Sequence, residues 1–129
     1  MPAGWSSAAS PPADFAFWNE DLRATVYADT SCGPRYQDSP LPILANNLTF
    51  GFTELETASE WTLTLSAREG LERVSRGKLD GVPMALAVSV LKKGPCVFDL
   101  VYVAAPATFE AGLPDYRAFR DGFEAEFSP

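Results

Sequence analysis

The sequence predicts an α+β domain in which one antiparallel β-sheet has helices packed on its faces. Three features support this class. The middle of the chain, from Arg68 to Ala104, is a series of extended apolar runs joined by short turns. One amphipathic stretch lies before this region and another lies after it. A strand-rich centre between two such helices is typical of a sheet closed by helices, here with about five to seven strands.

A three-stranded meander is the centre of this prediction, with strands expected over residues 68–79, 82–91 and 97–103. Asp80-Gly81 joins the first two runs and is a strong hairpin signal, because a type I′ turn needs positive φ at both central residues. The second run alternates large side chains such as Leu86 with small ones such as Ala87. We expect the large side chains to pack on the core. The small side chains should either admit a closely packed neighbour or face solvent.

Upstream of the meander, the sequence predicts a linker, a hairpin and one further strand. Residues 1–13 are rich in Ser, Ala and Pro and are expected to form a flexible N-terminal linker. Residues 14–18 and 22–28 are extended runs separated by Asn-Glu-Asp, which predicts a hairpin. Residues 60–65 alternate polar and apolar side chains and predict the strand that enters the meander.

Two amphipathic helices are predicted. Ser39 is a suitable N-cap and Pro40 suits the first helical position, so a helix is expected to begin there. Its apolar stripe comprises Leu41, Leu44, Ala45 and Leu48. Pro114 is expected to open the last helix, whose aromatic residues at spacings of three and four are Tyr116, Phe119, Phe123 and Phe127. We expect Phe119 and Phe123 to be buried against the sheet.

Composition excludes several classes of function. The chain of 129 residues fits a single domain, assigned to residues 14–129, and its net charge of −7 disfavours nucleic-acid binding, which needs positive charge. No run of 18 apolar residues is present, so no membrane-spanning helix is predicted. The absence of histidine removes His-based acid–base catalysis and most zinc sites. No phosphate-binding glycine loop occurs, and we expect no enzymatic activity, no cofactor and no metal.

The two cysteines, Cys32 and Cys96, allow one bridge. In an exported protein a disulfide is the expected state, whereas two buried reduced thiols are the alternative in a cytosolic protein. A reactive thiol is disfavoured because no histidine can act as its base. A Cys32–Cys96 bridge requires the loop after the second strand to end beside the start of the last strand. The bridge therefore tests the topology.

Four aromatic residues are candidates for binding a protein partner: Trp18, Tyr27, Tyr36 and Trp61. Large aromatic side chains that stay exposed mark binding surfaces, because aromatic anchors dominate the energy of protein interfaces. The alternative for each is ordinary packing in the core. The acidic composition favours a basic or neutral partner, because like charges slow encounter.

Several segments carry a family resemblance: Arg68-Glu69-Gly70-Leu71, Leu79-Asp80-Gly81-Val82, and residues 100–110 followed by Tyr116, Phe119 and Phe123. In the order hairpin, helix, meander and aromatic helix, the chain resembles the PsbP-like superfamily from about residue 14 to residue 127. That superfamily includes Mog-type Ran-binding proteins, DcrB-like lipoproteins and Eag-type chaperones. The resemblance implies an α/β/α sandwich that binds proteins and has no common active site. No Ran-binding motif of the Mog type can be mapped onto this sequence.

Two functions from different classes remain open. The first is a non-enzymatic accessory or protein-binding module outside the cytoplasm, periplasmic or associated with the outer membrane, with a lipid anchor upstream of Met1 as one expected form. The second, implied by the Eag-type relatives, is a cytosolic chaperone that cradles apolar helices for type VI secretion. An oxidised cysteine pair favours the first function and a reduced pair favours the second.

Overall fold

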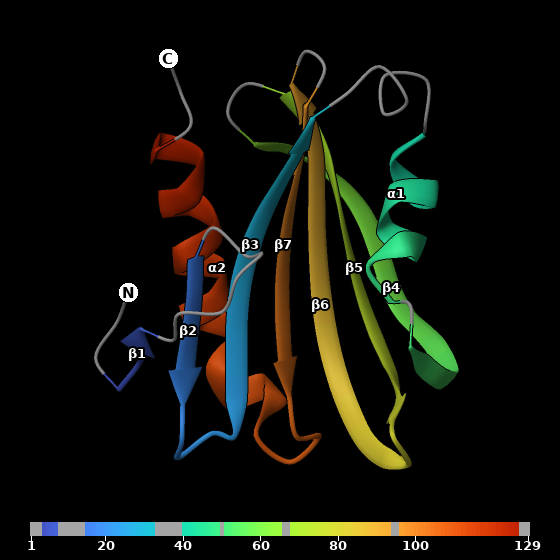
Figure 1. Ribbon diagram of the computed structural model, residues 1–129, viewed down its shortest axis with the longest axis vertical. Helices are drawn as coiled ribbons and strands as arrows, with labels where there is room; N and C mark the ends of the chain where they lie inside the picture. Colours follow the sequence, from blue (N-terminus) through green and yellow to red (C-terminus); the bar gives the residue numbers. More distant parts are fainter. Residues whose placement is uncertain are drawn as a thin grey trace.

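The computed structural model describes residues 4–7, 15–32, 40–49, 51–65, 68–93 and 96–126. Its centre is a seven-stranded sheet in the order β1-β2-β3-β7-β6-β5-β4, with every pair antiparallel (Figure 1). The strands are β1 (Ser6–Ser7), β2 (Phe15–Asn19), β3 (Ala24–Cys32), β4 (Phe52–Leu65), β5 (Arg68–Leu79), β6 (Val82–Lys93) and β7 (Cys96–Ala104). The helices are α1 (Leu41–Asn47) and α2 (Phe109–Glu126). The predicted α+β class is confirmed.

The two helices cover opposite faces of the sheet. Along β7, Leu100 and Tyr102 belong to a core cluster that includes Tyr116 of α2. The intervening Val101 belongs to a second cluster that includes Leu44 of α1. Because successive side chains of a strand point to opposite faces, α1 and α2 lie on opposite sides, as Figure 1 shows. The domain is an α/β/α sandwich.

The predicted meander is present with its predicted turn. Asp80 has φ 51° and Gly81 has φ 81°, as a type I′ hairpin turn requires. The small side chains of β6 are buried on the α2 side, where Ala85 and Ala87 lie in the same cluster as Tyr116. The first of the two expectations for this face is therefore correct: a helix packs closely on it. The large side chains of β6, including Leu86, are buried on the α1 side.

The start of α2 differs from the prediction. The helix begins at Phe109 rather than at Pro114, and Pro114 lies inside it. Phe109 is buried, and the Tyr102 hydroxyl donates a hydrogen bond to its carbonyl oxygen at 2.8 Å. The Thr108 hydroxyl also donates to the carbonyl oxygen of Leu22. These contacts with the sheet hold an additional helical turn before the proline.

Other element boundaries also move. Strand β4 begins at Phe52 rather than at residue 60, because the preceding residues pair with β5 through two irregularities in register. Helix α1 has Pro40 as its N-cap residue, and the predicted cap Ser39 lies outside the described residues. In α2, Phe119 is half-buried, with its ring centroid 5.6 Å from that of Phe17. The side chain of Phe123, predicted to be buried, lies outside the described part of the chain.

Part of the predicted N-terminal linker is attached to the domain. Strand β1 pairs with β2, placing Ser6 opposite Trp18. The Trp5 indole Nε1 donates a hydrogen bond to Asp115 Oδ2 on α2 at 2.9 Å. Composition predicted a linker over residues 1–13 that is mobile unless something docks it, and residues 4–7 are docked, because Trp5 packs against the α2-side core. The rest of this range lies outside the described residues.

A buried polar network joins α2 to the sheet. Glu72 on β5 is fully buried, and its Oε1 accepts hydrogen bonds from Ser89 Oγ at 2.8 Å and Arg120 Nη1 at 2.6 Å. The Ser89 and Tyr116 hydroxyl oxygens are 2.6 Å apart. Arg117 Nε lies 3.7 Å from Glu72 Oε2. A buried charge with several partners fixes the position of α2 on its face.

Candidate binding groove

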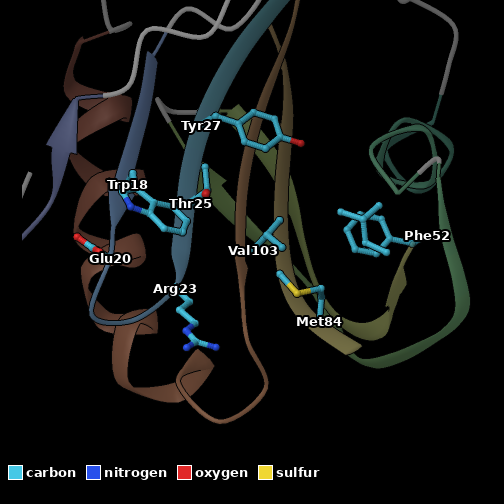
Figure 2. Close-up of a pocket in the computed structure, with 9 residues that line it drawn as sticks. Trp18, Glu20, Arg23, Thr25, Tyr27, Phe52, Met84 and Val103 are labelled. Atoms are coloured by element: carbon cyan, nitrogen blue, oxygen red, sulfur yellow. The ribbon is translucent and has the colours of Figure 1, made fainter. Parts of the chain in front are cut away.

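Helix α1 leaves part of its face of the sheet uncovered, and an apolar groove of about 630 Å³ lies there (Figure 2). We call it the α1-face groove. It is lined by Trp18, Glu20, Arg23, Thr25, Tyr27, Phe52, Leu79, Met84 and Val103. Its volume is in the range of sites that hold a drug-sized molecule or a short segment of a partner.

The sheet register explains how these residues meet. The β2–β3 hairpin places Trp18 opposite Thr25, and the β3–β7 pairing places Thr25 opposite Val103. These three side chains therefore form one row on the α1 face. Figure 2 shows Trp18 at one side of the groove and Phe52 at the other, with Val103 and Met84 between them.

Two of the four exposed large hydrophobic residues in the described structure line this groove. The exposed large hydrophobic residues of the described structure are Trp18, Ile43, Leu79 and Val82. Trp18 is 42% exposed and Leu79 is 38% exposed, and both line the groove. Val82, 56% exposed, pairs with Leu79 at the end of the β5–β6 hairpin. Contiguous exposed apolar side chains mark interaction sites more reliably than scattered ones.

Charged groups lie beyond both ends of the apolar stretch. Glu20 and Arg23 line the groove at the β2–β3 turn. Farther along β3, on the same face as Tyr27, Asp29 lies opposite Asp99 of β7. Burial and the neighbouring Asp29 carboxylate raise the pKa of Asp99 to about 7. Burial, followed by the Asp99 and Asp29 carboxylates, raises the pKa of Tyr27.

A smaller cavity of about 230 Å³ adjoins the Asp29–Asp99 pair beneath α1. Its lining residues are Ser31, Leu44, Asn47, Leu48, Val97 and Asp99. Within the described ranges, no group of three His, Cys, Asp or Glu side chains could hold a metal ion. The arrangement can therefore offer an apolar surface and negative charge, but it does not assemble a set of metal ligands from the residues that are placed.

Two of the four predicted partner-binding residues meet in the groove. Trp18 and Tyr27 both line it, but Trp61 lies on the other face, with its ring centroid 5.7 Å from the Arg117 guanidinium carbon. Trp61 is opposite Glu72 in the β4–β5 register. Tyr36 lies outside the described residues. The sequence did not indicate Phe52 or Leu79, whereas Met84 follows the same alternation along β6 as Leu86, which was predicted to face the core.

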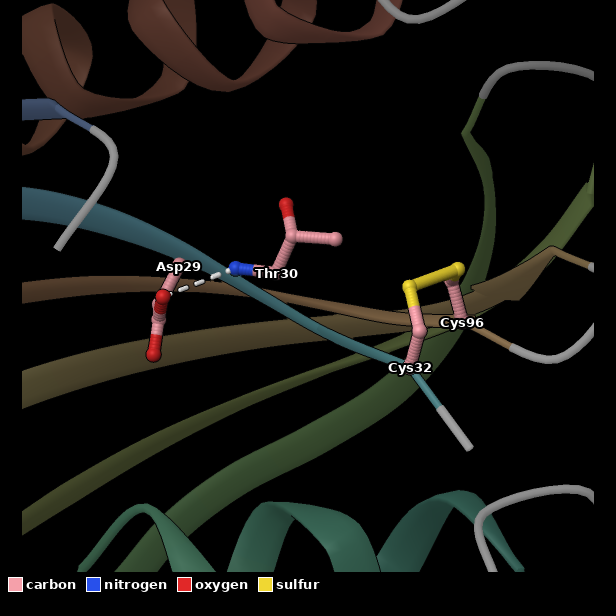
Figure 3. Close-up of a disulfide and its surroundings, with 4 residues drawn as sticks. All are labelled: Asp29, Thr30, Cys32 and Cys96. Atoms are coloured by element: carbon pink, nitrogen blue, oxygen red, sulfur yellow. Dashed lines mark hydrogen bonds between the residues drawn. A yellow bond between two sulfur atoms is a disulfide. The ribbon is translucent and has the colours of Figure 1, made fainter. Parts of the chain in front are cut away.

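The predicted Cys32–Cys96 disulfide is present (Figure 3). The two residues are paired in the β3–β7 register, with a Cα–Cα distance of 4.0 Å. The bridge joins the ends of two central strands that are 64 residues apart in sequence. Figure 3 also shows Asp29 and Thr30 of β3 pointing to opposite sides of the sheet.

Among the described residues, neither helix is both long and apolar enough to cross a membrane. No protein-family model matches the chain, and no curated protein sequence matches it significantly.

Solved structures share the fold at low sequence identity. LpqN of Mycobacterium tuberculosis, described as involved in cell envelope biogenesis, has a TM-score of 0.66 and 14% identity, covering 95% of this chain and 78% of its own. PA94 of Pseudomonas aeruginosa has a TM-score of 0.61 and 14% identity, with coverages of 94% and 85%. Cyanobacterial PsbP from Synechocystis sp. PCC 6803 has a TM-score of 0.60 and 15% identity, with coverages of 91% and 79%. The predicted PsbP-like fold is confirmed.

Proposed function

We propose that the domain is a non-enzymatic accessory module that works outside the cytoplasm and binds a protein partner in the α1-face groove. The observation that carries this proposal is the exposure of Trp18 and Leu79 beside Tyr27 and Phe52 along one apolar surface. Leaving such a surface in water is unfavourable, and aromatic residues in pockets are the usual anchors of protein interfaces.

The floor of the groove favours a helical occupant. Val103 belongs to β7 and Met84 to β6, and both strands have a hydrogen-bonded neighbour on each side. An incoming segment therefore cannot extend the sheet at this place. It must satisfy its own backbone hydrogen bonds, as an α-helix does, and contribute an apolar face.

Charge favours a basic residue at the end of that helix that meets the Asp29–Asp99 pair. The chain carries a net charge of −7, and the Asp29–Asp99 pair lies just beyond Tyr27. A cation placed there would offset the burial of Asp99 and its repulsion by Asp29, which together raise the pKa of Asp99. The distance along β3 from Arg23 to Asp29 is about 20 Å, which corresponds to about 13 residues of α-helix. The proposed occupant is a basic-ended amphipathic helix of that length.

The disulfide supports a location outside the cytoplasm, because such bridges persist in oxidising compartments. LpqN, which shares the fold, is involved in cell envelope biogenesis, and that role is consistent with this location. A lipid anchor added upstream would place the module at a membrane surface, and metabolic labelling of the full-length gene product with a fatty acid would test it. The second candidate, a cytosolic chaperone for apolar helices, shares the groove but requires Cys32 and Cys96 to be reduced in the cell.

A defined peptide tests the proposed function. We would titrate a synthetic amphipathic helix with lysines at one end against the wild-type protein and the Trp18→Ala variant, using calorimetry. Trp61→Ala is the matched control because Trp61 lies on the other face. We expect saturable binding that weakens about 30-fold, or about 2 kcal/mol, in Trp18→Ala only.

Three outcomes would contradict the proposal. They are no binding by the wild type, equal loss in the Trp61→Ala control, and equal binding of a peptide with the same composition in scrambled order. Vesicles of anionic lipid serve as a separate probe. Binding to vesicles through Trp18, without binding to the helix, would show that the groove takes lipid rather than protein.

A further inference from the structure

The two edges of the sheet are very different. At one edge is β1, which has only two residues, and at the other is β4, which has 14. A long edge strand presents unpaired backbone groups to any other strand, and natural proteins usually protect such edges with bulges, charges or proline. Whether β4 carries these protections decides what this edge can do.

The first half of β4 is protected. Its register with β5 shifts between Thr53 and Glu56 and again between Thr57 and Ser59. Glu54 has φ 51°, an uncommon conformation for a residue other than glycine. Its carboxylate also lies 2.9 Å from Lys78 Nζ. Bulges and exposed charges of this kind prevent regular pairing with a new strand.

The second half of β4 lacks these protections. From Ser59 to Leu65 the register with β5 runs without a shift, from Ser59 opposite Val74 to Leu65 opposite Arg68. The one charged residue of this segment, Glu60, forms an ion pair of 2.6 Å with Arg73 of β5. In the described sheet no strand lies on the outer side of this segment. It is a regular strand edge with its charge already neutralised.

We propose that residues 59–65 pair antiparallel with the same segment of a second copy of this chain, about a two-fold axis at Thr62. The two sheets then become one continuous sheet. In this register Trp61 lies opposite Leu63 of the second copy, and this pair occurs twice. Thr62 lies opposite Thr62, and Glu60 lies opposite Thr64. Aromatic–aliphatic and Thr–Thr cross-strand pairs are favourable.

The sequence of the segment is compatible with pairing to a second copy in this register. A chain with a net charge of −7 can pair with itself only where acidic side chains avoid one another. Moving the axis by two residues to Glu60 would place the two Glu60 side chains directly opposite, which is unfavourable. Moving it to Thr64 would place Trp61 opposite residue 67, beyond the end of β4. The axis at Thr62 avoids both problems.

The proposed interface is separate from the α1-face groove. Residues 59–65 include none of the residues that line the groove. On the α2 face, the guanidinium of Arg117 lies over the Trp61 ring and holds it in place before pairing. The inference therefore does not depend on the proposed function, and it accounts for Trp61, the aromatic candidate that the groove does not use.

Sedimentation velocity from micromolar to millimolar concentration tests the inference. We expect the wild type to form dimers as concentration rises. Thr62→Lys and Thr62→Glu each place like charges opposite at the axis, so each should weaken the dimer about tenfold or more. Thr57→Lys, in the bulged half, is the control and should dimerise as the wild type does. A thermal unfolding curve for each variant confirms that it is folded.

Mixing the two charged variants tests the register. Thr62→Lys and Thr62→Glu should form a heterodimer, because opposite charges then meet at the axis. A wild type that stays monomeric at millimolar concentration would overturn the proposal. So would a Thr62→Lys variant that dimerises like the wild type, or a mixture that remains monomeric. A dimer weakened equally by Thr57→Lys would show that pairing uses another surface.

Discussion

The two faces of the sheet are covered to different extents. On one face α2, with 18 residues, packs along the sheet and holds a buried network centred on Glu72. On the other face α1 has seven residues and leaves the groove beside it open. The α2 face is covered by its helix, whereas the α1 face retains exposed apolar side chains at the groove. This difference is the basis of our proposal that the α1 face binds a partner, whereas the α2 face stabilises the fold.

Aromatic stacking reinforces the α2 face. The Tyr102 ring centroid lies 5.1 Å from that of Phe109 and 5.5 Å from that of Tyr116. Burial raises the pKa of Tyr102 to about 12, with smaller contributions from nearby Asp115 and Glu110. The Tyr102 and Tyr116 hydroxyl groups are both hydrogen-bonded within the core, so neither is available as a catalytic acid near neutral pH.

The largest effect is expected for Glu72→Ala on the α2 face. The change leaves the Arg120 guanidinium, whose side chain is 13% exposed, without its carboxylate partner. We expect a loss of about 3–5 kcal/mol in the free energy of unfolding, measured with urea. Glu60→Ala is the matched control on the α1 face. Its carboxylate is 37% exposed, and the buried Arg73 keeps hydrogen bonds to Asn46 and to the Pro42 carbonyl oxygen, so we expect a smaller loss of about 1–2 kcal/mol. Equal losses would remove the contrast between the faces.

Breaking the disulfide affects both faces, because the bridge joins two central strands. We expect the double variant Cys32→Ser/Cys96→Ser to lose about 4 kcal/mol in the chain-entropy model. Intact mass with and without reductant establishes the oxidised state of the wild type. A protein isolated from its native compartment with both thiols free would favour the cytosolic chaperone.

Gly112→Ala tests how closely α2 approaches the sheet. An added Cβ would lie 2.3 Å from the Tyr102 hydroxyl oxygen, so the helix or the ring must move. We expect a loss of about 1–3 kcal/mol by thermal unfolding. Gly122→Ala is the control on the same helix, because its Cβ would meet nothing within 4 Å. This control should be neutral or slightly stabilising. A neutral Gly112→Ala would show looser packing of α2 than the contacts indicate.

Asp99→Asn should stabilise the α1 face in a pH-dependent way. The pKa of Asp99 is about 7 in the folded state and 3.8 without burial, so the folded protein binds this proton more tightly. Unfolding then releases a proton, and stability falls as pH rises from about 4 through about 7. The titratable and charged groups on this face near Asp99 are Asp29 and Tyr27 on β3, with Lys92 two residues beyond Val90, the partner of Asp99 on β6.

Asparagine cannot ionise, so the variant should lack this decline. At pH 8 we expect it to be more stable than the wild type by about 1–2 kcal/mol, a figure reduced because the carboxylate is partly open to solvent. At pH 4 the two proteins should be alike. Urea unfolding at several pH values is the measurement. The expectation would be contradicted if the free energies of unfolding of the wild type and of Asp99→Asn changed by the same amount between pH 4 and pH 7.

The class of the fold was predictable because its signals are local. Asp80-Gly81 specifies its own turn, and the alternation of β6 depends only on neighbouring residues. The pairing of Cys32 with Cys96 followed from there being two cysteines and one consistent topology. Helix boundaries were less predictable. Pro114 is typical of a helix start. The helix nevertheless begins earlier, because Tyr102 donates a hydrogen bond to the Phe109 carbonyl oxygen and Thr108 donates one to the Leu22 carbonyl oxygen.

The candidate sites depend on contacts between distant segments. Trp18 and Tyr27 were chosen for residue type alone, and the sheet register brings them into one groove. Phe52 meets them only because α1 is short and β4 begins earlier than its alternation indicates. The network around Glu72 could not be predicted either. A glutamate in a strand is usually expected to face solvent, and only the packing of α2 on the sheet brings Arg120 to Glu72.

The smallest stability change and the largest binding change are expected at the same residue. Trp18 is 42% exposed, so Trp18→Ala should change the free energy of unfolding by about 1 kcal/mol or less. Leu86→Ala, at a fully buried site of the same face, should cost about 2–5 kcal/mol.

Measuring both quantities for Trp18→Ala, the free energy of unfolding and the affinity for the basic-ended helical peptide, tests the assignment of binding to the α1 face most directly. The account predicts near-normal stability together with about 30-fold weaker binding. Normal binding by a folded Trp18→Ala variant would contradict it.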